Sequence, residues 1–264
     1  MTVRDALDAA VTAIEAAGCA TPRLDAELLI ADALGVDRAQ LFMDPDMEIP
    51  PAAARVIAAN VRRRVAREPV AYITGRKGFR HIELAIDPRA IIPRPETELL
   101  VDVAAAQPAG ARVHDVGTGT GAIALALLDE RPDLKVTASE PYAPAAEVAR
   151  ENAARLGLPL EVTDEFGIPE GEYDLIVANL PYVRDDQWDG MQPEIRKYEP
   201  REAFVSGTDG LDAIRELIAE ARSGTQIALE HGNEQGAAVR EMLDDARSYP
   251  DLANWERITV GRVP

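Results

Sequence analysis

The sequence predicts an α/β fold, a doubly wound and mostly parallel sheet, preceded by a small all-α domain and a β-hairpin linker. Apolar residues recur at helical spacing from Val3 to about Arg67, whereas they alternate between Ile82 and Ile86. After Ala111, strand-like and helix-like segments follow one another in turn, which favours right-handed βαβ units. We therefore predict three parts, at residues 1–70, 71–91 and 92–264.

The first part has the turn and capping residues of a bundle of four short helices. A glycine closes a helix or a proline opens one at Gly18, Thr21-Pro22, Gly35 and Pro50-Pro51. In the second part, Ile82, Leu84 and Ile86 share one face, and we expect Gly75 and Gly78 to mark turns. Pro95 then opens another helix, because its preset φ suits the first helical position.

The third part is predicted to consist of alternating strands and helices. We expect strands at 111–117, 135–140, 160–164, 173–179, 225–231 and 255–260, and helices at 121–130, 144–156, 210–222 and 233–246. Residues 180–209 read as a long loop. Residues 247–254 are short for a separate strand, so we expect the C-terminal antiparallel hairpin to be abbreviated.

Composition excludes several classes of protein. The 264 residues carry 28 Lys and Arg against 46 Asp and Glu, a net charge of −18, so overall charge argues against direct binding of nucleic acid. No apolar stretch is long enough to span a membrane, and we expect a cytoplasmic protein. Cys19 and the three histidines have no metal-ligand spacing, so we expect no metal.

A glycine-rich turn follows the first strand of the third part. Gly117, Thr118, Gly119, Thr120 and Gly121 lie where a strand ends and a helix begins, and the glycines let a ligand approach the backbone. Glu140 ends the next strand, where its carboxylate would accept hydrogen bonds from both hydroxyls of a ribose. The turn and the acid together favour an adenosyl ligand.

Other interpretations of this turn stay open. Ala122 completes the spacing G-x-G-x-x-A, which also allows a dinucleotide site. The glycines could instead serve only a tight strand-to-helix connection. Asp164, at the end of the third strand, could reach an adenine amino group by analogy with similar sheets, or be an ordinary surface aspartate.

A second motif, Asn179-Leu180-Pro181-Tyr182, follows the fourth strand. Its place at the carboxyl edge of the sheet is where open α/β folds bind ligands. The Asn179 side chain and the Leu180 backbone each offer a carbonyl acceptor, and Tyr182 offers a flat aromatic wall. Together they suit the two N–H donors of a planar amide or amino group, held with its nitrogen toward a methyl donor. For an isolated tetrapeptide, turn formation would be the alternative.

Separated motifs in one order give the chain a family resemblance. IPRPETELLV (92–101), DVGTGTGAIALAL (115–127), ANLPY (178–182), YEPREAFVSGTDGLDAIR (198–215) and ALEHGNEQG (228–236) resemble the bacterial HemK/PrmC protein-glutamine N5-methyltransferases, which modify peptide-chain release factors. The resemblance implies S-adenosylmethionine as cofactor and methylation of the glutamine in the Gly-Gly-Gln tripeptide of a release factor.

The resemblance also implies roles for particular residues. Residues 117–121 would surround the methionine part of the cofactor, Glu140 would hold its ribose, and the segment from Asn179 to Tyr182 would hold the substrate glutamine, with Asn179 also next to the cofactor. The family has Asn-Pro-Pro-Tyr in this segment, so Leu180 departs from it, keeping the backbone carbonyl but losing the rigidity of proline. We expect a class I methyltransferase fold.

Three alternatives to this function stay open: methylation of a ribosomal-protein glutamine, methylation of an adenine amino group in nucleic acid after base flipping, and a catalytically silent cofactor-binding module.

The stretch of residues 55–80 holds eight basic residues and one acid. It is either a solvated face or a docking patch for an acidic protein partner. The position of His114 inside an apolar strand predicts a histidine buried in the core. Glu230 and His231, at the end of the fifth strand, could support the loop that carries Asn179.

Overall fold

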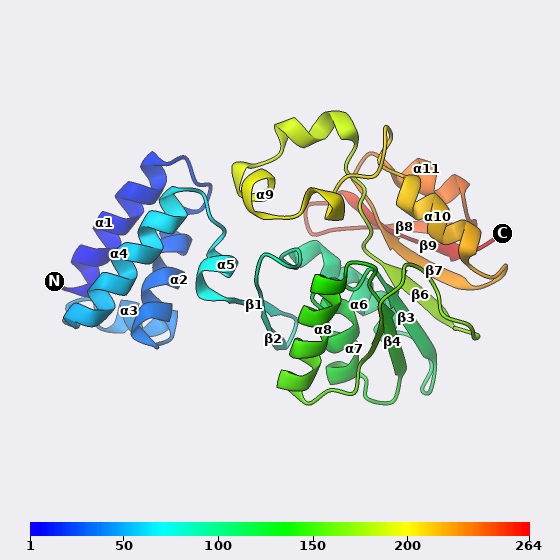
Figure 1. Ribbon diagram of the computed structural model, residues 1–264, viewed down its shortest axis with the longest axis horizontal. Helices are drawn as coiled ribbons and strands as arrows, with labels where there is room; N and C mark the ends of the chain where they lie inside the picture. Colours follow the sequence, from blue (N-terminus) through cyan, green and yellow to red (C-terminus); the bar gives the residue numbers. More distant parts are fainter. The chain divides into compact units, whose positions relative to one another are not determined.

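The computed structural model describes all residues, 1–264, as two compact units. One comprises Met1–Arg76 and Gln192–Tyr198, and the other Lys77–Met191 and Glu199–Pro264. Each is described by itself below. None of the helices in Figure 1 combines the length and apolarity that crossing a membrane requires.

The first unit is helical. It contains α1 (Val3–Ala16), α2 (Pro22–Leu34), α3 (Arg38–Met43), α4 (Pro51–Val65), α5 (Val70–Thr74) and, from far along the chain, α9 (Pro193–Tyr198). Its core forms from apolar side chains at helical spacing, including Leu7, Ile14, Leu29, Leu41 and Ile57. Thr2 and Asp5 form a reciprocal capping box at the start of α1.

A buried ionic cluster joins α9 to the rest of this unit. Arg64 donates hydrogen bonds to Asp25 (2.7 Å) and Glu194 (2.9 Å), and Arg67 also donates to Glu194 (2.7 Å). The Tyr198 hydroxyl donates to the Ala66 carbonyl (3.0 Å). These contacts use two of the arginines in the basic stretch 55–80 to bind a segment of the same chain.

The second unit begins with a hairpin of β1 (Arg76–Phe79) and β2 (Ile82–Ala85). Gly75 ends α5 with φ of 72°, and Gly78 lies inside β1, so the expectation that Gly78 marks a turn is wrong. The turn falls instead at Arg80, whose φ is 52°. The Asn152 side chain anchors the hairpin, accepting from the Ala85 N–H (2.7 Å) and donating to the Ala85 carbonyl (3.1 Å).

The main sheet has the order β5-β4-β3-β6-β7-β9-β8. Its strands are β3 (Arg112–Val116), β4 (Lys135–Ser139), β5 (Glu161–Thr163), β6 (Leu175–Ala178), β7 (Gln226–Glu230), β8 (Asp244–Pro250) and β9 (Glu256–Arg262). The first five run parallel, and β9 is antiparallel to both β7 and β8. The strand order therefore reverses between β3 and β6, the point where open sheets of this kind bind ligands.

Helices cover the sheet, as Figure 1 shows. They are α6 (Glu98–Ala105), α7 (Ala122–Glu130), α8 (Ala143–Leu156), α10 (Asp212–Glu220) and α11 (Gly236–Glu241), with 3-10 turns at Pro95–Thr97, Asp185–Gly190 and Arg201–Ala203. Ile214 and Leu217 of α10 pack on Val116, Ile176 and Leu229 of the sheet. The doubly wound fold predicted from the alternating pattern is confirmed.

Two sequence-based expectations about residues 180–264 are wrong. The helix predicted to reach 246 ends at Glu241, and the freed residues form the seven-residue strand β8, so the C-terminal hairpin is complete. β8 is an edge strand with mostly exposed side chains, which is why it shows no apolar alternation. The long loop 180–209 contains α9 and two of the 3-10 turns, which are too short to show periodicity.

Candidate active site

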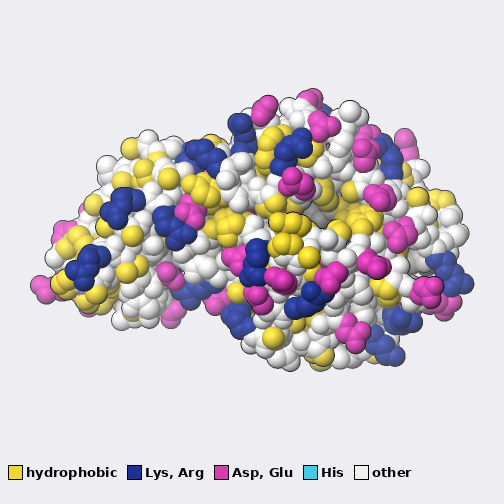
Figure 2. All heavy atoms as spheres, viewed as in Figure 1, with side chains coloured by type: hydrophobic (Ala, Val, Ile, Leu, Met, Phe, Trp, Pro, Cys, Tyr) yellow, Lys and Arg dark blue, Asp and Glu magenta, His cyan; other side chains and the backbone are white.

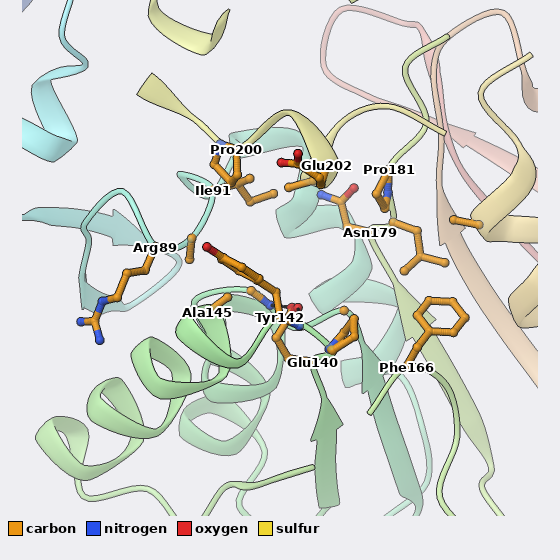
Figure 3. A pocket seen from close by; sticks show the side chains of 17 residues that line it. Arg89, Ile91, Glu140, Tyr142, Ala145, Phe166, Asn179, Pro181, Pro200 and Glu202 are labelled. Carbon is orange, nitrogen blue, oxygen red and sulfur yellow. Dashed lines mark hydrogen bonds between the residues drawn. The ribbon is translucent and has the colours of Figure 1, made fainter. Parts of the chain in front are cut away.

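A cavity of about 450 Å³ opens at the carboxyl ends of β3, β4 and β6, inside the second unit (Figure 3). This volume falls in the ordinary range of small-molecule sites. Its lining includes Gly117, Gly119, Glu140, Phe166, Asn179, Leu180 and Pro181. The space-filling view shows hydrophobic side chains gathered around a hollow in this unit, with acidic and basic side chains near it (Figure 2).

The glycine turn forms the floor of the cavity. Gly117 and Gly119 have φ of 70° and 57°, a conformation that glycine adopts without strain. A Cβ on Gly117 would lie 3.0 Å from Leu180 Cδ2. Gly121 does not line the cavity, because it caps α7, and a Cβ there would lie 2.8 Å from Leu125 Cδ1.

Asp115 stabilises this turn through hydrogen bonds. It is completely buried in β3, and its Oδ2 accepts from the Thr118 hydroxyl (2.6 Å) and the Ala124 N–H (3.3 Å), while Oδ1 has no hydrogen-bond partner. Burial raises the pKa of this carboxyl to about 7. Thr118 therefore holds the turn rather than lining the cavity. Thr120 does not line the cavity either, and its carbonyl holds the turn by accepting from the Asn152 side chain (3.0 Å).

Glu140 lies at the rim, directly after β4. Its Oε2 accepts from the Gly119 N–H (2.9 Å) and its Oε1 from the Tyr142 N–H (3.0 Å), so two backbone donors fix the carboxyl group. Burial raises its pKa, against the lowering effect of these hydrogen bonds. A carboxylate oxygen has more than one acceptor site, so Glu140 can still accept from a ligand.

The tetrapeptide is divided between the cavity and the protein interior. Asn179, Leu180 and Pro181 line the cavity. Tyr182 does not line it. Its hydroxyl donates to Glu230 Oε1 (3.2 Å), and burial raises the pKa of that hydroxyl. The flat aromatic wall expected of Tyr182 is therefore not part of the cavity lining.

Asp164 lies outside the cavity, exposed and paired with Arg150 at 2.6 Å. Phe166, two residues further along the chain, lines the cavity instead, and Figure 3 shows its ring on the side away from Arg89. His114 is a fully buried core histidine, as predicted. Its ring nitrogens bond Thr137 and Ser139, and burial lowers its pKa to about 4.

Arg94 and Glu199 each belong to a motif whose sequence suggested a place near the substrate, but no sequence pattern predicted that they pair and so join two cavity-lining segments. Glu199 accepts from the Ile92 N–H (3.0 Å) and from Arg94 (2.6 Å). Their neighbours Ile91 and Pro200 lie together at the cavity in Figure 3. Nothing in the sequence places these two distant segments side by side. No group of three or more His, Cys, Asp or Glu side chains is arranged to hold a metal ion.

Comparison with known proteins gives this site its context. Residues 5–75 match the family described as PrmC N-terminal domain, and residues 95–193 match the methyltransferase small domain. The release factor glutamine methyltransferase of Xylella fastidiosa is 43% identical over 92% of this chain and 94% of its own length. The release factor glutamine methyltransferase of Cereibacter sphaeroides is 39% identical over 100% of this chain and 99% of its own length.

The chain belongs to the release factor glutamine methyltransferase family. The predicted membership in this family is confirmed, and the enzyme is an S-adenosylmethionine-dependent methyltransferase. Among solved structures, the catalytic domain of hMettl16 in complex with a 3'UTR hairpin is 13% identical and superposes with a TM-score of 0.53 over 69% of this chain and 75% of that one. This likeness concerns the fold alone.

Proposed function

We propose that this protein methylates the side-chain amide nitrogen of the glutamine in the Gly-Gly-Gln segment of a peptide-chain release factor. The observation that carries the proposal is the place of Asn179. It lines the cavity beside the glycine turn, and its Nδ2 donates to the Thr97 hydroxyl (3.0 Å), so its Oδ1 remains for a substrate amide. Full-length relatives with this name at about 40% identity support the same reaction.

The cavity lining fits S-adenosylmethionine. Gly117 and Gly119 have no side chain at its floor, so the cofactor can lie against the backbone. Glu140 and Phe166 both line the cavity. In this proposal Glu140 accepts from the ribose hydroxyls, and Phe166 offers an apolar surface to the adenine. Asp164 is a weaker candidate for the adenine amino group, because Arg150 already pairs with it. When bound, the cofactor supplies an electrophilic methyl group on a positively charged sulfur.

The tetrapeptide holds the nucleophile. A glutamine amide nitrogen reacts poorly because its lone pair is delocalised. Asn179 Oδ1 and the Leu180 carbonyl accept its two N–H groups, which raises electron density on nitrogen as the new C–N bond forms and the S–C bond breaks. One N–H proton then leaves to water. Pro181 fixes the backbone at this point, and Tyr182 anchors it through Glu230.

Leu180 replaces the first proline of the family's Asn-Pro-Pro-Tyr without removing the acceptor, because the acceptor is a backbone carbonyl. Its side chain is 4% exposed and packs in the core with Val116 and Ile214. That packing restrains a position where proline would restrain φ. We therefore propose that the leucine is compatible with catalysis.

The other parts of the chain have roles in the same proposal. Residues 1–70 dock the release factor, residues 71–91 link, and residues 92–264 bind the cofactor and carry out catalysis, in the cytoplasm. Five of the basic residues in 55–80 are used in internal ion pairs: Arg63, Arg64, Arg67, Arg76 and Arg80. Arg55 and Arg62 are exposed seven residues apart on α4, and thus on one helix face, available for an acidic partner.

The experiment is transfer of labelled methyl from S-adenosylmethionine to a purified release factor, beside a copy whose Gly-Gly-Gln glutamine is replaced by alanine. We expect label on the unaltered factor only. Label on both copies would contradict the proposed site. Label on DNA or RNA oligomers instead would favour amino methylation of a base, and cofactor binding without any transfer would favour a silent module.

A further inference from the structure

The side-chain amide of Gln235 contacts three separate backbone segments of the second unit. Gln235 is half-buried and directly precedes α11. Its Nε2 donates to the carbonyl of Tyr182 (3.0 Å) and to that of Asp209 (2.9 Å), and its Oε1 accepts from the Gly232 N–H (2.8 Å). Both hydrogens of the amide and its oxygen are therefore used, and only this orientation satisfies all three backbone groups.

The sheet brings Gln235 beside the end of the tetrapeptide. β6 and β7 are parallel neighbours, with Ala178 opposite Leu229, so the residues after both strands leave the same edge. The tetrapeptide follows β6, and the segment 231–236 follows β7. Neither Gln235 nor Tyr182 lines the cavity. Gln235 can therefore act on a substrate only through the backbone that it holds.

The turn at Asp209 and Gly210 packs against the same carbonyl. Gly210 has φ of 77°, and a Cβ there would collide with the Tyr182 carbonyl oxygen and lie 2.6 Å from Gln235 Nε2. Three residues further on, at the start of α10, Ala213 lines the cavity. The Gln235 amide thus fixes both the end of the tetrapeptide and the turn that leads into α10.

We propose that Gln235 is a positioning residue for the methyl transfer, acting through the Tyr182 carbonyl on the backbone of the tetrapeptide. The Leu180 carbonyl, one of the two acceptors for the substrate amide, belongs to that backbone, and leucine lacks the fixed φ of proline. Tyr182 is held at its hydroxyl by Glu230 and at its carbonyl by Gln235, which limits the movement of that acceptor. This inference rests on the proposed function for the identity of the substrate amide.

The first test compares Gln235→Glu with Gln235→Met. The glutamate keeps an oxygen for the Gly232 N–H but turns a carboxylate oxygen, which cannot donate, toward the Tyr182 and Asp209 carbonyls. The methionine is of similar length and makes none of the three hydrogen bonds. A misplacement of about 1 Å can cost about 100-fold in rate, so we expect both variants to lose about 10- to 100-fold in kcat. The Kd for S-adenosylmethionine should stay within about twofold, because Gln235 does not line the cavity.

The glutamate variant separates positioning from a local structural role. If Gln235 served only to hold Gly232, Gln235→Glu would keep that contact and remain active. A kcat for Gln235→Glu within about twofold of the unaltered protein would therefore overturn the inference. Asn233→Asp is the matched control, because it makes the same amide-to-carboxylate change at an exposed position two residues away.

Gly210→Ala reaches the same carbonyl without altering Gln235. Its Cβ should displace the Tyr182 carbonyl oxygen, and we expect the loss in kcat to match that of the Gln235 variants. Gly224→Ala, with φ of 83° and no atom within 4 Å of its Cβ, measures the cost of the backbone conformation alone. A kcat for Gly210→Ala equal to that of Gly224→Ala would overturn the inference.

A readout without substrate keeps the inference separate from the proposed function. Tyr182-Val183 is the only Tyr-Val pair in the sequence, so protein labelled with ¹³C-carbonyl tyrosine and ¹⁵N valine gives one correlated carbonyl signal. We expect this signal to move in Gln235→Glu, because the Tyr182 carbonyl loses a hydrogen bond, and to stay in place in Asn233→Asp. An unmoved signal in Gln235→Glu would overturn the inference whatever the substrate. A moved signal in a protein that methylates no release factor would support the contact and count against the proposed function alone.

Discussion

The Arg94 guanidinium donates a 2.6 Å hydrogen bond to the Glu199 carboxylate, whose side chain is 1% exposed. The second oxygen of Glu199 accepts from the Ile92 N–H at 3.0 Å. One buried carboxylate therefore joins two segments that are far apart in the sequence and whose neighbours Ile91 and Pro200 both line the cavity. This pair holds together one wall of the cavity.

Replacing Glu199 by glutamine should weaken cofactor binding. The amide keeps one acceptor but turns two N–H donors toward a site where both partners are donors, which costs about 1–3 kcal/mol. We expect the Kd for S-adenosylmethionine, measured by calorimetry, to rise about tenfold. The exposed Glu216→Gln on α10 is the control. A Kd equal to that of the control would show that the pair does not shape the site.

Gly117 should not tolerate a methyl group. Its φ of 70° costs a non-glycine residue about 1–2 kcal/mol, and the new Cβ would press on Leu180 Cδ2 at 3.0 Å. We expect Gly117→Ala to raise the cofactor Kd more than about tenfold, and Leu180→Ala to relieve the steric part. Gly35 has a similar φ of 66°, and a Cβ there would meet no atom within 4 Å. The loss in free energy of unfolding in Gly35→Ala therefore measures the backbone cost without a steric part. Unchanged affinity in Gly117→Ala would be inconsistent with a cofactor lying on the turn.

Much of the fold could be predicted because its strands are either alternating or wholly apolar. β6 is buried along its whole length, as a central parallel strand should be. β8 was missed because it is an edge strand that packs one face weakly and carries charge. Helix α9 is six residues long, so no periodicity marks it, and its partner Arg64 is distant in the sequence.

Stability should fall as pH rises, through the buried Asp115. Its folded pKa is about 7 and its ordinary pKa 3.8, so the folded state keeps a proton that the unfolded state loses. The stability that this difference contributes is complete below about pH 4 and is lost as pH approaches 7, by up to about 4 kcal/mol. Denaturant unfolding of Asp115→Asn between pH 4 and pH 8 should show a flatter profile. A profile identical to that of the unaltered protein would refute the shift. Burial, helped by the nearby charge of Glu96, raises the pKa of Glu230 to about 7 against the opposing effects of Tyr182 and Arg257. Glu230 therefore adds a pH dependence of the same sign, and it does so equally in the unaltered protein and in Asp115→Asn.

Asn152 should be essential to the stability of the second unit. It is fully buried on α8, and its side chain bonds both backbone groups of Ala85 and the carbonyl of Thr120. Asn152→Ala leaves these groups unsatisfied, and we expect a loss of about 3 kcal/mol or more. Asn152→Asp should be worse at neutral pH, because a carboxylate would face two carbonyl oxygens. The free energy of unfolding, measured in denaturant with the exposed Asn233→Ala as control, tests this expectation. For Asn152→Ala, a loss of free energy of unfolding below about 1 kcal/mol would contradict it.

The site could be predicted only where its residues follow strands. Because parallel strands end at one edge, the turn after β3 and Asn179 after β6 had to meet there. The parts that depend on contacts between distant segments could not be predicted in this way. Thr97 reaches Asn179, and Tyr182 turns inward to Glu230 rather than facing the cavity. No local pattern carries that information.

Asn179→Ala tests the proposed methyl transfer most directly, because the Asn179 side chain is proposed to accept from the substrate amide. Single-turnover transfer to a release factor should slow by about 10²- to 10³-fold, the usual loss when one preorganised hydrogen bond in the transition state is removed. The Kd for S-adenosylmethionine should change by less than about threefold. Equal losses in rate and in cofactor affinity would contradict the account, because they would place Asn179 in cofactor binding rather than in the transfer step.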